Sequence, residues 1–221
     1  MAEDVFIART ARPAHTPARC WHGLEAGAPR MSQDGKALRR AIRESRRATP
    51  AGKRIAAAER LAERLLALPF APLGGHVAGY WAVDGEIGLH AWQLRLPPSL
   101  TYCLPVLHGD VLHFAPWRPG DALVSNRYGI PEPDVAADTL LAAEEMTLVV
   151  APLVAFDVHC RRLGMGAGWY DRSFAFRRER TAPPWLVGAA FAAQQVDAIA
   201  AEPWDVPMDA VCTELDTLVA T

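Results

Sequence analysis

The segment of this sequence best suited to chemistry is a glycine-rich stretch flanked by arginines. It reads R-L-G-M-G-A-G-W-Y-D-R and runs from Arg162 to Arg172. Its alternate glycines, Gly164, Gly166 and Gly168, would let successive backbone N–H groups approach an anion closely, and the start of a following helix would add partial positive charge. A continuous apolar run precedes the stretch, which is where ligands bind in open α/β sheets. The stretch therefore predicts a phosphate-binding loop.

The spacing of these glycines does not by itself identify the ligand. The pattern G-x-G-x-G differs from the dinucleotide fingerprint G-x-G-x-x-G and from the Walker loop, which ends in Gly-Lys-Ser/Thr. Taken alone, an ordinary tight turn explains it equally well. Other catalytic patterns are missing from the sequence, since the histidines lack the spacing of a zinc hydrolase and neither a G-x-S-x-G elbow nor a C-x-x-C pair occurs.

The whole stretch resembles the signature of the 5-formyltetrahydrofolate cyclo-ligase family, also called 5,10-methenyltetrahydrofolate synthetases, whose usual form is R-L-G-x-G-x-G-Y-Y-D. The likeness extends over roughly residues 35–215 through further matches in the same order. These are L-R, D-G-E-I, L-P-V-L, Y-G-I-P-E-P and W-D-V-P-x-D, which begin at Leu38, Asp84, Leu104, Tyr128 and Trp204. Several separated matches in order are much harder to obtain by chance than one.

The resemblance implies a ligase that uses ATP and Mg²⁺ to cyclise 5-formyltetrahydrofolate to 5,10-methenyltetrahydrofolate, with release of ADP and phosphate. Phosphorylation turns the formyl oxygen into a leaving group, and N10 then attacks the formyl carbon. Such a site must align two substrates and stabilise negative charge. The implied partners are these small molecules, with neither nucleic acid nor membrane, and we expect a monomer.

The resemblance also assigns roles to individual residues. The residues that it implies for ATP binding are Lys36, Arg39, Arg162, Gly164, Met165, Gly166, Gly168, Trp169 and Tyr170. Arg162 and Asp171 are the implied catalytic residues, and Asp171 with Asp209 would bind Mg²⁺ through carboxylate oxygens. The residues implied for folate binding are Trp81, Glu86, Tyr128 and Trp169. The glutamate would accept hydrogen bonds from the pterin, and the flat aromatic side chains would stack on the rings of the folate.

Without the resemblance, these residues have ordinary explanations, and two positions depart from the family's pattern. Arg39 would be a solvated arginine and Glu86 a surface residue. Ala167 stands where many members have lysine, and Lys36 is one residue out of register with the family's early lysine. We expect Arg162 or Arg39 to compensate for the lysine that is missing from the loop.

The elements that must position these residues alternate between helix and strand. Amphipathic spacing predicts a helix from Lys36, and Thr49-Pro50 predicts the N-cap and first position of a second helix that ends before Pro69. The expected strands are 76–83, 101–107, 111–117, 146–156 and 185–191, and the further expected helices are 88–96 and 169–180. The apolar run 146–156 is the best candidate for a central strand. We therefore predict an α/β fold, a single three-layer domain with a mostly parallel central sheet, preceded by two amphipathic helices.

Length and composition limit what the chain can be. The 221 residues are 51% apolar and carry a formal charge of −2, which fits one globular domain without a global field for nucleic acid. Residues 1–31 lack an apolar face, so we expect a disordered leader before a cyclo-ligase-like domain over 32–221, and a start at Met31 would exclude that leader from the native protein. The longest nearly unbroken apolar run, 148–156, is too short to cross a bilayer. Four scattered cysteines favour reduced thiols and the cytoplasm.

Two alternatives remain open from the residues themselves. One is another nucleotide- or sugar-phosphate-binding α/β enzyme that shares the loop but not the reaction. The other is a non-enzymatic polyanion-binding protein, since residues 35–64 hold ten basic and three acidic side chains. Binding of RNA would weaken steeply with salt, whereas only a cyclo-ligase would need 5-formyltetrahydrofolate to turn over ATP.

Overall fold

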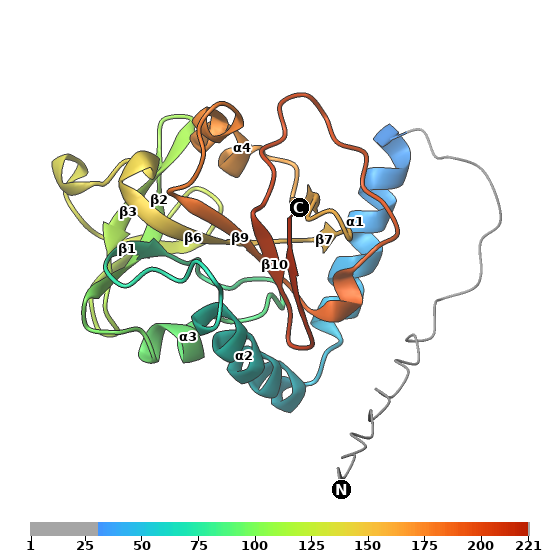
Figure 1. Ribbon diagram of the computed structural model, residues 1–221, viewed down its shortest axis with the longest axis horizontal. Coiled ribbons are helices and arrows are strands. Elements are labelled where there is room, and N and C mark those ends of the chain that lie inside the picture. The colour runs from blue at the N-terminus through green and yellow to red at the C-terminus, as the bar shows by residue number, and fades with distance from the viewer. Residues whose placement is uncertain (1–30, 221) are drawn as a thin grey trace, which may run out of the picture. The chain divides into compact units, whose positions relative to one another are not determined.

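The computed structural model describes residues 31–220, in which helices cover both faces of a seven-stranded sheet (Figure 1). The strand order is β11-β10-β9-β6-β1-β2-β3. Their bounds are β1 Gly75–Ala78, β2 Leu100–His108, β3 Val111–Pro116, β6 Met146–Pro152, β9 Trp185–Ala189, β10 Ala210–Cys212 and β11 Thr217–Val219. The five inner strands are parallel and the two edge strands are antiparallel to their neighbours. The predicted α/β fold with a mostly parallel sheet is confirmed.

Four α-helices and two small ribbons complete this part of the chain. The helices are α1 Met31–Arg47, α2 Ala51–Leu66, α3 His90–Leu94 and α4 Trp169–Ser173. One ribbon pairs β4 Leu123–Ser125 with β5 Pro131–Pro133, and the other pairs β7 Ala155–Phe156 with β8 Arg162–Leu163. Short 3-10 helices lie at Ala137–Thr139, Ala143–Glu145, Ala175–Arg178 and Ala192–Gln194.

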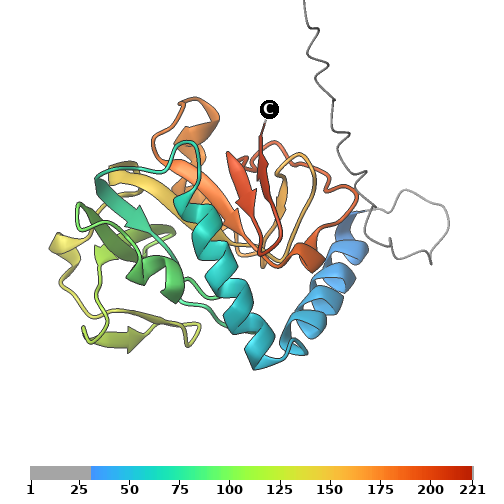
Figure 2. The same ribbon diagram turned by 60° about the horizontal axis from the view of Figure 1, so that its bottom comes forward.

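Two apolar clusters cover the sheet, because successive side chains of a strand point to opposite faces. On one face Leu148 of β6 packs in a cluster with Leu61 of α2 and Trp92 of α3, and Figure 2 shows α2 crossing that face. On the other face the next residue, Val149, packs in a cluster with Phe174, which follows α4. β6 is therefore buried on both faces and is the central strand of the seven, as its continuous apolar run predicts.

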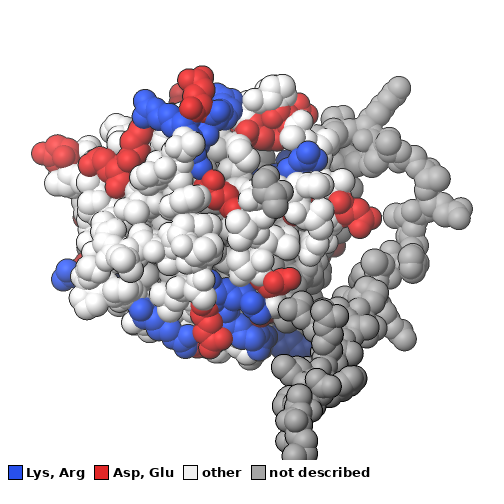
Figure 3. Space-filling model, viewed as in Figure 1, with Lys and Arg blue, Asp and Glu red and all other residues white. Residues whose placement is uncertain are grey.

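Charged side chains gather in separate regions of the surface. Figure 3 shows one group over α4 and another over α2, with a largely uncharged area between them. Both signs are present in each group. This face therefore carries no extended field of a single sign, as the formal charge of −2 leads one to expect.

The chain leaves β1 and β6 in opposite directions across the sheet. After β1 it passes through α3 to β2 on one side, whereas after β6 it passes through α4 to β9 on the other. Loops that follow the carboxyl ends of two such neighbouring strands diverge, and ligands bind between them in open α/β sheets. Segments 79–89 and 153–168 are therefore the ones that should bound a site.

The helices differ from the predictions mainly at their ends. α1 begins at Met31 rather than Lys36, and α2 begins after Pro50, which takes the N-cap position expected for Thr49. The helix expected over 88–96 contracts to α3. The helix expected over 169–180 is interrupted where the buried Phe174 leaves the helical conformation, so α4 has only five residues. So short a helix has little macrodipole, and the expected help of its N-terminus in phosphate binding is not supported.

The strands differ from the predictions where glycine and proline interrupt them. The run 146–156 splits after Pro152, since proline has no N–H for the ladder. The strand expected over 76–83 ends at Ala78, and a Cβ at the next residue, Gly79, would lie 2.2 Å from the Tyr102 Oη. The closing segment holds β10 and β11, where the sequence pattern predicts no strand because three-residue strands show no periodicity.

Other expectations concern the leader, the thiols and the membrane. The leader lies outside the described residues except for residue 31, which begins α1. Cys103, Cys160 and Cys212 are buried free thiols, whereas Cys20 lies outside the described part. Between residues 31 and 220, none of the helices combines the length and the apolar character that crossing a bilayer requires.

Candidate functional site

The predicted phosphate-binding loop, residues 164–168, connects β8 to α4 and is open on one side. Gly166 and Gly168 have φ angles of +99° and +68°, in the region that side chains disfavour. A Cβ on Gly164 would meet no described atom within 4 Å, and one on Gly166 would meet nothing nearer than 3.8 Å, where the Arg39 guanidinium begins. The loop therefore leaves space beside its backbone instead of packing against protein.

Two arginines hold the loop by its carbonyl groups. The Arg39 Nε of α1 donates to the Gly164 carbonyl at 2.8 Å, and the Arg172 Nη1 donates to the Ala167 carbonyl at 2.8 Å. Arg172 also binds the Asp110 carbonyl at 2.7 Å. Arg39 therefore lies beside the glycines, as its predicted role in ATP binding requires. The site residues predicted from the sequence do not include Arg172, although it ends the motif. Two guanidinium groups thus flank a loop in which alanine, at position 167, stands where many family members have lysine.

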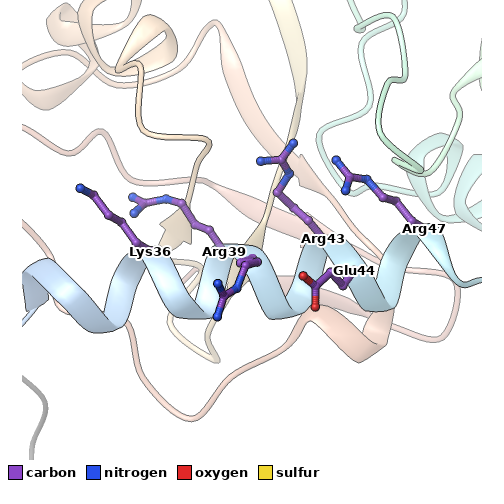
Figure 4. Close-up of a pocket in the computed structure, with 6 residues that line it drawn as sticks. Lys36, Arg39, Arg43, Glu44 and Arg47 are labelled. Carbon is purple, nitrogen blue, oxygen red and sulfur yellow. The ribbon is translucent and has the colours of Figure 1, made fainter.

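α1 presents a row of basic side chains next to this loop. Figure 4 shows Lys36, Arg39, Arg43 and Arg47 on one side of the helix, with Glu44 on the other. These side chains line a hollow along α1. Lys36 therefore projects on the same side as Arg39, in spite of its shifted register.

Arg162 and Asp171 pair with each other at the base of the loop. The Arg162 Nη2 donates to the Asp171 Oδ1, and its Nη1 donates to the Val206 carbonyl at 3.2 Å. The same Asp171 oxygen accepts the Val206 N–H at 3.1 Å. The Arg162 side chain is largely buried. These bonds join the glycine motif to the W-D-V-P segment, and in this arrangement Arg162 supports the loop rather than facing its open side.

Asp209 lies at a different edge of the sheet. Its two carboxylate oxygens accept hydrogen bonds from the Arg177 Nη2 at 2.8 and 2.9 Å, and Oδ2 also accepts the Leu186 N–H at 2.7 Å. Because Leu186 is the second residue of β9 and Asp209 directly precedes β10, Asp209 stands at the amino ends of the parallel strands. Glu86 and the segment leading to Gly164 instead follow carboxyl ends. Within residues 31–220, no group of three or more His, Cys, Asp or Glu side chains is placed to hold a metal ion.

Glu86 lies in the turn after β1 and is largely buried. Its Oε2 accepts the Val83 N–H at 3.0 Å, and its Oε1 lies 3.7 Å from the Arg46 Nη1. Burial raises the pKa of Glu86 above its usual value, although the Val83 hydrogen bond and the Arg46 charge oppose this effect. The structure therefore places this carboxylate inside the protein, not on the surface.

Tyr170 lies in α4, directly after the glycine loop. Burial raises the pKa of Tyr170 most, the Glu86 charge raises it further, and the Arg162 charge lowers it. The phenol is therefore within electrostatic reach of both groups, and the Arg162 guanidinium lies 5.9 Å from the centre of its ring. The pKa of this tyrosine thus responds both to a residue predicted to bind folate and to a residue predicted to bind ATP.

The predicted aromatic residues fall into two groups. Tyr128 and Trp169 meet edge to face with their ring centres 6.4 Å apart, and the Arg127 guanidinium lies 5.4 and 5.0 Å from these two centres. The indole N–H of Trp169 is buried without an acceptor among the described residues. Trp81 instead meets Trp117 edge to face at 5.8 Å. Thus only Tyr128 and Trp169 contact each other at the glycine loop.

Comparison with known proteins points to one family. The sequence model of the 5-formyltetrahydrofolate cyclo-ligase family matches residues 31–214. The 5-formyltetrahydrofolate cyclo-ligase of Escherichia coli (strain K12) is 35% identical over 179 residues, which cover 78% of this chain and 96% of that protein. The enzyme of the same name from Mycolicibacterium smegmatis is 32% identical over 193 residues, or 83% of this chain and 95% of its own.

Two solved structures have the same fold. The NMR structure of Aquifex aeolicus 5,10-methenyltetrahydrofolate synthetase superposes with a TM-score of 0.70 at 25% identity, covering 84% of this chain and 92% of that one. The 5,10-methenyltetrahydrofolate synthetase from Mycoplasma pneumoniae gives a TM-score of 0.62 at 22% identity, covering 82% and 99%. The second likeness bears on the fold alone.

Proposed function

This chain belongs to the 5-formyltetrahydrofolate cyclo-ligase family and is thus a ligase of folate one-carbon metabolism, and on that premise we propose that it converts 5-formyltetrahydrofolate to 5,10-methenyltetrahydrofolate at the expense of ATP. The observation that carries the proposal is that α1 contacts both the glycine loop, through Arg39, and Glu86, through Arg46, at the carboxyl ends of β6 and β1. The monomeric state and the cytoplasmic location stay predictions.

The proposed reaction has two steps. The formyl oxygen attacks the γ-phosphorus of ATP, and the bond between that phosphorus and the bridging oxygen breaks to release ADP. The N10 lone pair then attacks the formyl carbon, phosphate leaves with the formyl oxygen, and N10 loses its proton to give the methenyl bridge. Neither step needs a strong acid or base, so the chain has to align two substrates and offset negative charge.

The open side of the glycine loop is the proposed place for the triphosphate. Gly164 and Gly166 leave room for phosphate oxygens, and Arg39 lies next to that space with its Nε on the loop carbonyl. Lys36 extends the positive charge along the same side of α1 (Figure 4). We assign Arg162 a supporting role in this arrangement, because Asp171 and the Val206 carbonyl already bind its guanidinium.

The folate is proposed to lie between Glu86 and the aromatic pair. An ionised Glu86 would accept N–H groups of the pterin, since a carboxylate is purely an acceptor. Tyr128 and Trp169 would contact the flat rings, and the unpaired indole N–H of Trp169 would be available to an acceptor on the substrate. Trp81 is a weaker candidate, because it packs on Trp117.

The residues present fit a magnesium ion only in part. The Asp171 Oδ1 is occupied by Arg162 and Val206, but its Oδ2 accepts no hydrogen bond from residues 31–220. Asp171 would therefore supply one oxygen to an ion held mainly by ATP and water, and that ion would offset charge on the phosphoryl group during transfer. Asp209 fits less well, because it would first have to lose its bonds to Arg177.

Replacing Asp171 by asparagine should raise the Mg²⁺ concentration needed for half-maximal activity by roughly 10- to 100-fold. The amide can still accept the Val206 N–H but carries no charge for the ion. The measurement is a magnesium titration of the initial rate at saturating ATP. Asp205→Asn is the matched control, because that carboxylate binds the Glu202 N–H of its own turn and should keep the wild-type requirement. An unchanged Mg²⁺ requirement in Asp171→Asn would show that Asp171 does not bind the ion.

The proposed reaction is tested by following the near-ultraviolet absorbance of the methenyl product. We expect the protein to form it only when 5-formyltetrahydrofolate, ATP and Mg²⁺ are all present, with one ADP released per product. ATP hydrolysis that ignores the folate would instead support another phosphate-binding α/β enzyme. Absence of product over a range of pH and metal concentrations would end the proposal.

A further inference from the structure

Three arginines of α1 converge on the turn that carries Glu86. Arg43 Nε and Arg46 Nη2 donate to the Asp84 Oδ2 at 2.5 and 3.2 Å, and Arg47 donates to Oδ1. Asp84 has a φ of +55°, and a Cβ on the following Gly85 would lie 3.2 Å from the Arg46 carbonyl oxygen. The turn thus packs directly against α1, and ion pairs between the three arginines and Asp84 hold it there.

Arg46 reaches further than the other two arginines. Its side chain is 1% exposed, against 34% for Arg43 and 54% for Arg47, whose bonds go to Asp84. Besides Asp84, the Arg46 guanidinium contacts the Glu86 Oε1 at 3.7 Å and donates to the Leu153 carbonyl at 3.4 Å. One buried group therefore touches the segments that follow both β1 and β6.

We propose that Arg46 is a positioning residue that keeps Glu86 ionised and fixes its orientation toward the substrate. The proposal rests on the proposed function for its choice of substrate. A buried carboxylate favours its neutral form, and a protonated Glu86 would present a donor where the pterin also presents donors. The planar guanidinium favours the charged form of Glu86, and its own hydrogen bonds to the Asp84 and Leu153 carbonyls fix its place.

The other charged or titratable groups that face Glu86 cannot replace Arg46. Arg43 also favours the charged form, but its influence is smaller and Asp84 opposes both arginines. Tyr80 of the same segment and Tyr170 of α4 stay neutral, since burial raises the pKa of both phenols. Among the charged side chains described, Arg46 favours the ionised carboxylate most, in addition to the hydrogen bond from the Val83 N–H.

The first test measures the ionisation of Glu86 without any ligand. A ¹³C NMR titration of the glutamate carboxyl groups, with the Glu86 signal assigned from Glu86→Gln, is compared in wild type, Arg46→Met and Arg47→Met. We expect Arg46→Met to raise the pKa of Glu86 by about one unit or more, a tenfold change in proton affinity. Arg47→Met is the matched control, because it removes a contact to Asp84 alone and should leave the titration unchanged.

The second test measures the affinity for 5-formyltetrahydrofolate as a function of pH. Wild type should keep its affinity to a lower pH than Arg46→Met, because Arg46 favours the ionised form of Glu86. A raised pKa means that Glu86 is protonated at a higher pH, so Arg46→Met should bind folate more weakly than wild type toward acid pH and regain wild-type affinity as the pH rises. A role confined to packing would weaken binding equally at every pH.

The outcomes separate this inference from the proposed function. An unchanged Glu86 titration in Arg46→Met overturns the inference whether or not folate binds, and so does a shifted titration with pH-independent affinity. Failure of the wild type to bind folate overturns the proposed function, while the titration still decides the influence of Arg46. If Arg46→Met does not fold, Arg46→Lys provides the test, since lysine keeps the positive charge but lacks the planar guanidinium with its several N–H donors. Wild-type folate affinity in that variant would contradict the orienting role.

Discussion

Turnover should be lost in Gly166→Val while the protein stays folded. Valine at a φ of +99° forces the loop backbone to change, and its methyl groups would enter the open space beside Arg39. We expect the rate of methenyl formation to fall by about 10³-fold or more, equivalent to ~4 kcal/mol of lost transition-state stabilisation. The measurements are the initial rate at saturating substrates and thermal unfolding.

Gly120→Val is the matched control for this variant. Gly120 has a φ of +105°, and no described atom lies within 4 Å of its Cβ position. The substitution thus introduces similar backbone strain, of order 1–3 kcal/mol, in a turn between β3 and β4. It should lower stability comparably and keep the wild-type rate. Equal rates in the two variants would show that the loop does not hold the phosphates.

The largest effect on stability is expected for Asp157→Ala. This side chain is 0% exposed, and its carboxylate accepts three backbone N–H groups, those of His159 and Arg161 at 2.9 and 3.1 Å and that of Ile199 at 3.0 Å. Alanine would leave the buried Ile199 N–H unpaired and remove the acceptor of two partly buried N–H groups. We expect the free energy of unfolding to fall by about 3–5 kcal/mol, which a denaturant titration would measure.

Asp121→Ala provides the comparison for this loss. Asp121 also accepts a backbone N–H, from Arg118 at 2.8 Å, but it does so at the surface, where water can replace it. The control should lose less than about 1 kcal/mol. A similarly small loss in Asp157→Ala would mean that the hairpin between β7 and β8 rearranges to pair its N–H groups elsewhere.

The parts of this fold that depend on local pattern could be predicted. The run of apolar residues that contains Leu148 indicated the central strand, because a strand buried on both faces needs apolar residues at every position. The alternate glycines around Gly166 indicated a loop open to a ligand, because glycine is the residue that readily adopts a positive φ angle. Both signals lie within about ten residues of sequence.

The parts that depend on distant partners could not be predicted. The helical spacing of α1 indicates solvated arginines, yet Arg46 is buried. This burial could not be predicted, because the partners of Arg46, Asp84 and Leu153, lie 38 and 107 residues away in the sequence. The sequence motif marks Asp171 as a ligand but does not indicate its pairing with Arg162. Three arginines engaged with Asp84 are also not free for a polyanion, which counts against the non-enzymatic alternative.

The attachment of α1 has a consequence for how the site assembles. Among residues 35–47, only Arg46 is buried, and none belongs to either apolar cluster. Detaching the helix from residue 35 onward would therefore withdraw only one buried side chain, that of Arg46, and elements with few apolar contacts open first. Its detachment would withdraw Arg39 and Arg46 together, so both substrates would lose their guanidinium support in one local event. During synthesis, moreover, this helix emerges long before Leu153 and Gly164, which makes its docking a late step of folding.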